Sequence, residues 1–198
     1  MLTIINHENI KGVGKSETKT QIILTHTNRK LSNYLQSLKL RYNGKYTKIP
    51  HYVIDRDGGV HKLLEDNEYS NNGKNIQINK KSIFISLENL GWLEKEPLKD
   101  HYINWIGDIY KGSVFTKKWR NYYFWQPYTE EQINSLYLLT KDLTKKFNIE
   151  FNIVGHNTLI SGVEKYSGIV SRSNFNNRYT DVNPSFDFEL FLKKIENE

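Results

Sequence analysis

The sequence contains no cysteine among its 198 residues. Disulfide bonds, zinc sites with thiolate ligands and cysteine nucleophiles are therefore excluded. Any metal site must be built from histidine, aspartate, glutamate or backbone oxygen. Long apolar runs are also missing, because no segment approaches the roughly 20 consecutive apolar residues that a membrane-spanning helix needs. We therefore expect no insertion into a membrane.

We also expect no secretion signal. The first residues, MLTIINHENIKG, lack the charged start and the long apolar stretch of a signal peptide. We expect synthesis in the cytoplasm, so that work outside the cell would need another route of export. Hydrophobic residues make up only 37%, but 13 Tyr, 9 Phe and 4 Trp bury large areas and make a core feasible. The length and the lack of a linker or repeat predict a single domain over 1–198. We expect the protein to be a monomer.

Charge is unbalanced towards the positive, with a net charge of +6. Lys and Arg are spread along the chain, which favours an anionic partner such as nucleic acid, a membrane surface or an anionic cell wall. No nucleic-acid-binding motif is present, so we expect no nucleic-acid partner. Gly14-Lys15-Ser16 resembles the end of a phosphate-binding loop, but that motif needs a glycine where this chain has Asn9.

Hydrophobic periodicity predicts an α/β chain. Apolar residues recur at helical spacing over 28–41 and over 128–149, and Thr129 with Gln132 forms a capping box for the second helix. A short helix is predicted to end the chain, while 93–128 and the long polar segment before that last helix are predicted to be irregular. The order of elements predicts a mixed sheet with helices on its faces. Strands are predicted at 1–5, 21–26, 52–54, from 60 after an Asp-Gly-Gly turn, 82–89 and 151–156.

Two of the predicted strands deliver a histidine at their carboxyl end. The runs IILTH and FNIVGH end on His26 and His156, and ligand sites in open α/β sheets lie beyond the carboxyl ends of strands. A catalytic zinc site takes three nitrogen or oxygen ligands and leaves one position for water. Asp181, in the turn-rich YTDVNPSFD, is the best third ligand; Asp187 is the alternative, although its place suits a helix cap. We expect structural or surface roles for the other histidines, His7, His51, His61 and His101.

Six segments resemble, in this order, the zinc-dependent type 2 N-acetylmuramoyl-L-alanine amidases: IILTHT, PHYVIDRDGGVHKL, SIFISLENLGW, PYTEEQINSLYLLTKDLTKKFNI, IVGHN and TDVNPSFDF. Phage lysozyme-amidases and peptidoglycan-recognition proteins share that fold, and the resemblance covers roughly residues 18–192. It implies a central mixed sheet flanked by helices, with one zinc ion bound by His26, His156 and Asp181. It also implies that a zinc-activated water cleaves the amide between N-acetylmuramic acid and L-alanine in peptidoglycan. A phage endolysin released through a holin pore, or a lysin carried in the virion, would fit such an activity.

The chain departs from the family pattern around the implied metal site. Many members have a glutamate, the usual base, where this chain has Ser86, and a lysine where it has Tyr179. We predict Glu88 as a replacement base, on the same face of the strand but displaced by about 6–7 Å. Tyr179 is predicted to donate a hydrogen bond to the oxyanion, and the insertion 157–180 to form a flap over the cleft. The alternative is an impaired module that binds peptidoglycan without cutting it.

The segment 93–128 is rich in aromatic residues and carries basic ones. Some of the aromatic side chains are expected in the core, and others could form a platform for sugar rings or the stem peptide. Its basic residues Lys117, Lys118 and Arg120 favour an anionic wall. The aromatic residues in question are Trp105, Tyr110, Trp119, Tyr122, Tyr123, Phe124 and Trp125.

Overall fold

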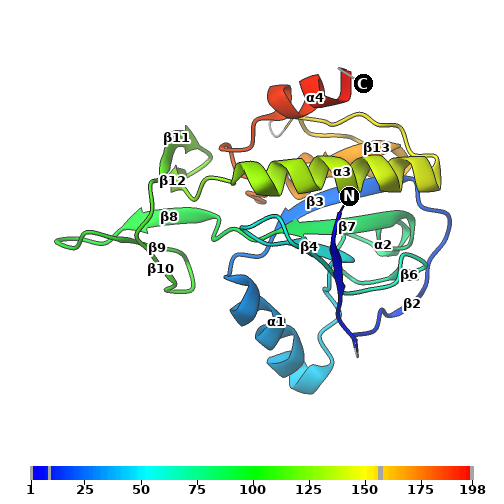
Figure 1. Cartoon of the computed structure of the whole chain (residues 1–198), viewed down its shortest axis with the longest axis horizontal. Helices are drawn as coiled ribbons and strands as arrows, with labels where there is room; N and C mark the ends of the chain where they lie inside the picture. The colour runs from blue at the N-terminus through cyan, green and yellow to red at the C-terminus, as the bar shows by residue number, and fades with distance from the viewer. Residues whose placement is uncertain (1, 9, 156–157, 197–198) are drawn as a thin grey trace.

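The computed structural model describes residues 2–8, 10–155 and 158–196. A six-stranded mixed sheet, in the order β1-β5-β4-β7-β3-β13, forms the centre, and helices cover both of its faces (Figure 1). The α/β class predicted from the sequence is confirmed. The strands of this sheet are β1 Ile4–Asn6, β3 Gln21–His26, β4 Tyr52–Ile54, β5 Val60–Lys62, β7 Ser82–Leu87 and β13 Gly168–Ser171.

The two long predicted helices are present. The Thr129 side chain accepts the N–H of Gln132, whose own side chain accepts the N–H of Thr129, so the predicted capping box starts the longest helix. Asp187 caps the last helix by accepting the N–H of Leu190 at 2.8 Å. The helices are α1 Leu31–Leu40, α2 Ile76–Lys81, α3 Glu130–Phe147 and α4 Phe188–Glu196, with 3-10 turns η1 Arg41–Gly44, η2 Val163–Lys165 and η3 Arg172–Asn174.

Alternate side chains of the central strands pack against opposite layers. Ile22 and Leu24 of β3 belong to the cluster with α3 and α4, whereas Ile23 belongs to the cluster with α2. The strands β3 and β7 run parallel and in register from Gln21 opposite Ser82 to His26 opposite Leu87. Because β13, β3, β7 and β4 are all parallel neighbours, their carboxyl ends meet at one edge of the sheet.

The prediction that 93–128 is irregular is wrong. This part of the chain forms a second, antiparallel sheet in the order β10-β9-β8-β12-β11, which projects from the main body (Figure 1). The Trp92 and Tyr122 rings stack with their centroids 4.2 Å apart. Trp125 is fully buried and supports the same sheet. The sequence did not predict this sheet, because its strands are too short to show a clear alternation of apolar and polar residues. They are β8 Trp92–Lys95, β9 Tyr102–Ile103, β10 Ile109–Tyr110, β11 Phe115–Trp119 and β12 Tyr122–Trp125.

Some aromatic residues of this sheet are buried and others are exposed, as predicted. Trp119 and Trp125 lie inside, whereas Trp105 and Tyr123 are about half exposed.

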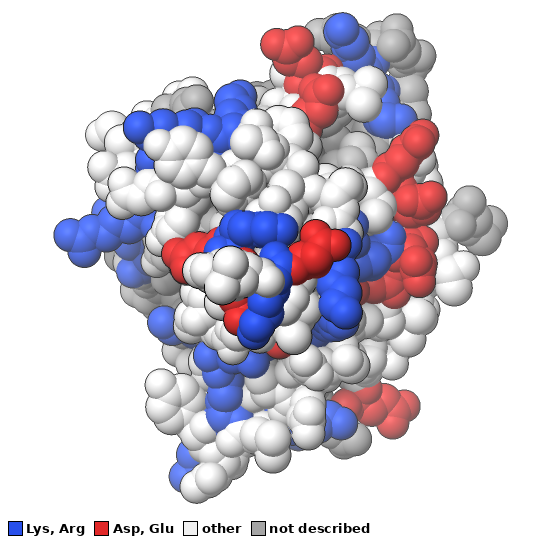
Figure 2. Space-filling model, turned by 90° about the vertical axis from the view of Figure 1, so that its left-hand side faces the viewer, with Lys and Arg blue, Asp and Glu red and all other residues white. Residues whose placement is uncertain are grey.

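Figure 2 shows the face on which the sheet projects towards the viewer, and the lower left of this face carries basic side chains without acidic ones beside them. A third, two-stranded sheet pairs β2 Gly14–Lys15 with β6 Glu68–Tyr69.

The last strand of the central sheet is not where the sequence placed it. Residues 151–155 make only a single bridge, from Ile153 to Ile169, and His156 lies outside the described residues. The strand beside β3 is β13, within the insertion that was predicted to form a flap. The flap prediction is wrong, because all four residues of Gly168–Ser171 are buried. The sequence gives little sign of this strand, since the apolar run is short and has polar residues on both sides. No helix in the described ranges is long and apolar enough to cross a bilayer.

His51 has the structural role predicted for it and should make stability depend on pH. Its Nδ1 accepts the N–H of Phe84 at 3.0 Å, so Nε2 carries the proton and donates to the Glu68 carbonyl at 3.1 Å. Burial lowers the pKa of His51 from 6.5 to about 3, with the charge of Lys19 adding to the effect. The unfolded chain therefore takes up a proton as the pH falls through 6.5, while the folded chain stays neutral.

We expect this residue to lower the free energy of unfolding by up to about 1.4 kcal/mol per pH unit below pH 6.5 and above pH 3. Urea denaturation at several pH values between 7 and 4 measures this slope. The variant His51→Asn keeps an acceptor but cannot titrate, so its slope should be shallower. Equal slopes for the two proteins would contradict the assignment.

Candidate functional site

His26 ends β3 and lines a cavity of about 170 Å³ at the carboxyl edge of the sheet. Ser86, from the neighbouring strand β7, and Trp105, from the turn between β9 and β10, also line it. The other charged residues of the lining are all basic, namely Arg29, Arg41, Lys48 and Arg172. The cavity is therefore suited to an anionic ligand.

The imidazole of His26 is buried and incompletely hydrogen-bonded. Its Nδ1 has no hydrogen-bond partner among the described residues. Gly91, with φ of +79°, packs so closely that a Cβ there would lie 3.1 Å from Nε2. Burial lowers the pKa of His26; the carboxylate of Asp181 opposes this, and the charge of Arg172 adds to it. A neutral imidazole with a free nitrogen is the form that binds a metal ion.

Asp181 lies at the same edge and is paired with an arginine that the sequence analysis missed. Arg172 follows β13 directly, and its Nε donates to Oδ2 of Asp181 at 2.5 Å. Burial alone would lower the pKa of Arg172, but the Asp181 carboxylate outweighs this and raises it. The run GIVSR could have revealed Arg172, because it is a short apolar strand that ends on a functional side chain, as IILTH does.

Tyr179 joins this group from the segment that leads to Asp181. The guanidinium of Arg172 lies over its ring, 5.1 Å from the centroid. The residue is 39% exposed. The structure thus brings together Tyr179, Arg172, Asp181 and His26.

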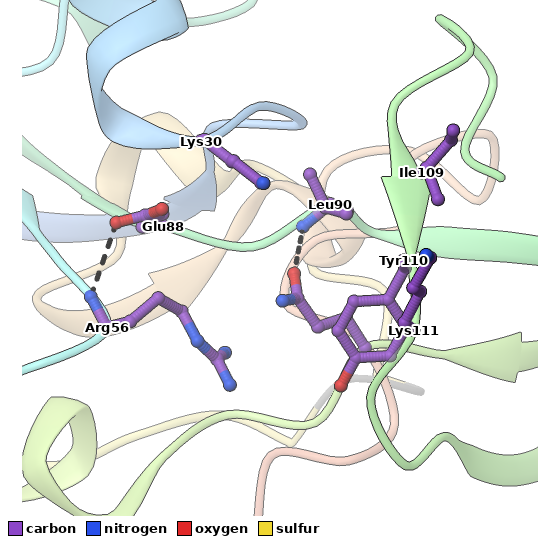
Figure 3. Close-up of a pocket in the computed structure, with 8 residues that line it drawn as sticks. Lys30, Arg56, Glu88, Leu90, Ile109, Tyr110 and Lys111 are labelled. Atoms are coloured by element: carbon purple, nitrogen blue, oxygen red, sulfur yellow. Dashed lines mark hydrogen bonds between the residues drawn. The ribbon is translucent and has the colours of Figure 1, made fainter. Parts of the chain in front are cut away.

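Glu88 is set apart from this group. Ser86 faces the His26 cavity and hydrogen-bonds Thr25 through its Oγ at 2.6 Å. The Glu88 carboxylate instead accepts the backbone N–H of Arg56 at 3.3 Å and lines an adjoining cavity of about 500 Å³ (Figure 3). The predicted base therefore lies next to the His26 cavity rather than inside it.

Two of the three predicted metal ligands can be assessed. Within the described ranges no group of three His, Asp or Glu side chains is placed to hold a metal ion, and the predicted ligand His156 lies outside those ranges. The unpartnered Nδ1 of His26 and the buried carboxylate of Asp181 are the nitrogen and oxygen donors that zinc binds. These two residues fit a zinc site.

A mixed sheet with a histidine and a buried carboxylate at its carboxyl edge defines an α/β protein with a candidate ligand site at that edge. Residues 15–172 match the model of the Amidase_2 family, described as N-acetylmuramoyl-L-alanine amidase. The chain therefore belongs to this family. No match was found among curated protein sequences.

Solved structures with the same fold include bacterial amidases and a phage endolysin. The amidase LysC from Clostridium intestinale has a TM-score of 0.60 at 14% identity, over 99% of each chain. The Ph2119 endolysin of a Thermus scotoductus bacteriophage has 0.55 at 13%, over 97% of this chain and 98% of that chain. AmiD from E. coli, solved in complex with anhydro-N-acetylmuramic acid-L-Ala-D-γ-Glu-L-Lys, has a TM-score of 0.57 at 17% identity. The match covers 90% of this chain and 58% of the AmiD chain. At these identities the similarity shows the fold alone.

Proposed function

We propose that this protein is a zinc-dependent N-acetylmuramoyl-L-alanine amidase that hydrolyses peptidoglycan. The observation that carries the proposal is the buried, unpartnered Nδ1 of His26 at the sheet edge where Asp181 lies, in a chain of the amidase family. A buried imidazole nitrogen without a partner is costly unless a ligand satisfies it. We assign the whole chain, 1–198, to one catalytic domain that acts as a monomer.

His26, His156 and Asp181 are the proposed zinc ligands. When bound, zinc supplies a water of lowered pKa and a Lewis acid for the scissile carbonyl. Arg172 holds the Asp181 carboxylate in place through its Nε. Gly91 leaves room for the His26 ring, because any Cβ at that position would press on it.

The charge of the cavity supports a substrate with carboxylates. Arg29, Arg41 and Lys48 line it without an acidic neighbour in the lining. Muramoyl peptides such as the one bound to AmiD, which ends on L-Lys, carry a carboxylate at the end of the peptide besides the one on the D-γ-glutamyl residue. We assign such muramoyl peptides, within the intact wall, as the substrate class.

Tyr179 and Glu88 are the proposed proton-handling residues. The phenol of Tyr179, an exposed residue next to Arg172, can donate a hydrogen bond to the oxyanion. Glu88 is the first carboxylate after Ser86 and directly follows the end of β7, and it would act from the adjoining cavity through an intervening water. Ser86 itself has no group that accepts a proton at neutral pH.

We assign the protein a role as a phage endolysin or virion-associated lysin. Such a lysin is made in the cytoplasm and meets the wall after release through a holin pore or as part of the virion. The second candidate is a module that holds peptidoglycan without cutting it. The observation that favours this candidate is Ser86, which occupies the cavity position where the usual family pattern has a glutamate.

Removal of zinc should abolish the activity. We expect the purified protein to clear a suspension of cell walls and to release peptides with a new N-terminal L-alanine. Dialysis against a chelator should lower this rate by ~10²-fold or more, because several kcal/mol of transition-state stabilisation are lost, and added zinc should restore it. Wall binding without any peptide release, with zinc present and across the pH range, would favour the binding module.

A further inference from the structure

A cavity of about 500 Å³ lies beside the His26 cavity, and Glu88 is the one residue of its lining that the proposed function uses. Its walls come from two parts of the molecule: Arg56 and Glu88 from the end of the central sheet, and Ile109 and Tyr110 from strand β10 of the projecting sheet (Figure 3). Leu90 lies between them. The cavity exists only because the projecting sheet packs against the edge where strands β4 and β7 end.

The charges around this cavity leave a positive excess. Lys30, Arg56 and Lys111 are basic and Glu88 is the only acidic residue of the lining. The Glu88 carboxylate already accepts the backbone N–H of Arg56. The ammonium groups of Lys30 and Lys111 have no hydrogen-bond or ion-pair partner among the described residues, and both residues are exposed.

The guanidinium of Arg56 is fixed and points towards the cavity (Figure 3). Its Nη1 donates to the carbonyl of Pro127 at 2.6 Å and to Oε1 of Gln132 at 3.1 Å. Both of these acceptors are uncharged, while the carboxylates of Glu88 and Asp57 interact with the guanidinium electrostatically. Leu90, Ile109 and Tyr110 also line the cavity, so it combines cationic groups with aliphatic and aromatic surface.

The two cavities lie on either side of the same short segments. Arg29 lines the His26 cavity and Lys30, the next residue, lines this one. Leu90 lines this cavity and Gly91, the next residue, packs on the His26 ring. Because consecutive residues line the two cavities, a ligand that reaches His26 with one end has this cavity close beside it.

We propose that this cavity binds a carboxylate in the peptide part of the substrate and thereby selects peptides with a free carboxylate over amidated ones. This inference rests on the proposed function for the identity of the ligand. The ammonium groups of Lys30 and Lys111 attract the carboxylate, and the aliphatic and aromatic surface contacts the neighbouring aliphatic groups. Each exposed lysine should contribute about threefold to the preference, since exposed ion pairs are weak.

Calorimetric titration of the full chain with two peptides tests the proposal. The probes are L-Ala-D-γ-Glu-L-Lys and the same peptide with the glutamyl carboxylate converted to an amide. We expect the acid to bind about tenfold more tightly at low salt, and the difference to shrink at high salt. Lys30→Gln and Lys111→Gln should each lower the preference about threefold, and the double variant should remove it.

Lys145→Gln is the matched control, because it makes the same charge change on the last turn of α3, far from Arg56 at the other end of that helix. It should leave the preference unchanged. Equal binding of both peptides by the wild-type protein, or a preference that survives in the double variant, would overturn the proposal. Hydrolysis of muramoyl peptides is followed in parallel. Hydrolysis without preference refutes this inference alone, whereas selective binding without hydrolysis refutes only the proposed function.

Discussion

Replacing His26 with alanine should lower the rate of muramoyl-peptide hydrolysis by ~10³-fold or more, because it removes a proposed zinc ligand and with it several kcal/mol of transition-state stabilisation. The protein should also lose bound zinc, measured by elemental analysis after gel filtration. The fold should persist, since the imidazole Nδ1 makes no hydrogen bond to the described residues. Circular dichroism and urea denaturation check this point.

His101→Ala is the matched histidine control. His101 bonds Glu96 on the projecting sheet and does not line the His26 cavity, so its loss should change neither the zinc content nor the rate. Tyr179→Phe should retain zinc and lower the rate by ~10–10²-fold, as expected for a group that donates a hydrogen bond to the oxyanion. Glu88→Gln should also retain zinc and lower the rate by ~10²-fold or more, as expected for a group that transfers protons. Retention of more than a tenth of the activity by His26→Ala would refute its assignment as a metal ligand.

Replacing Arg172 with methionine should cost about 3–5 kcal/mol of unfolding free energy, because it leaves the buried carboxylate of Asp181 without its partner. Urea denaturation in the presence of a chelator measures this loss. Arg172→Lys should lose less, since it keeps the charge while changing the geometry of the pair. The exposed neighbour Arg178, replaced by methionine, should change stability by less than about 0.5 kcal/mol.

A double variant separates the charge effect from lost packing. In Arg172→Met with Asp181→Asn no charge remains buried, so most of the stability should return. The two changes would then be strongly non-additive, with a coupling energy above about 1 kcal/mol. Additive effects, or a loss below about 1 kcal/mol in Arg172→Met, would show that the pair does not hold Asp181 in place.

Much of the candidate site could be predicted from local sequence. The run IILTH is apolar up to a polar end, so it predicts a buried strand that delivers His26 to the sheet edge, and β3 does this. The capping box of Thr129 and Gln132 fixes the start of α3, and the Asp-Gly-Gly turn predicts the hairpin of β4 and β5. Each of these signals lies within a few residues, where the physical cause and its effect are neighbours in the chain.

Other features depend on contacts between distant segments. The strands of the projecting sheet have two to five residues each, too few to establish a period of two. The short strand β13 is identified by its parallel pairing with β3. Because of this pairing, the segment predicted to be a flap contains the edge strand of the central sheet.

The sequence by itself determined the residue types available for a metal site, the strand that carries His26, and the longest helix. The tertiary structure alone decided that Arg172 neutralises Asp181 and that the aromatic segment closes a second cavity beside Glu88 and Arg56. The reason is that charge pairing and cavity formation depend on distances in space. Local periodicity does not encode those distances when each partner lies on a strand of only a few residues.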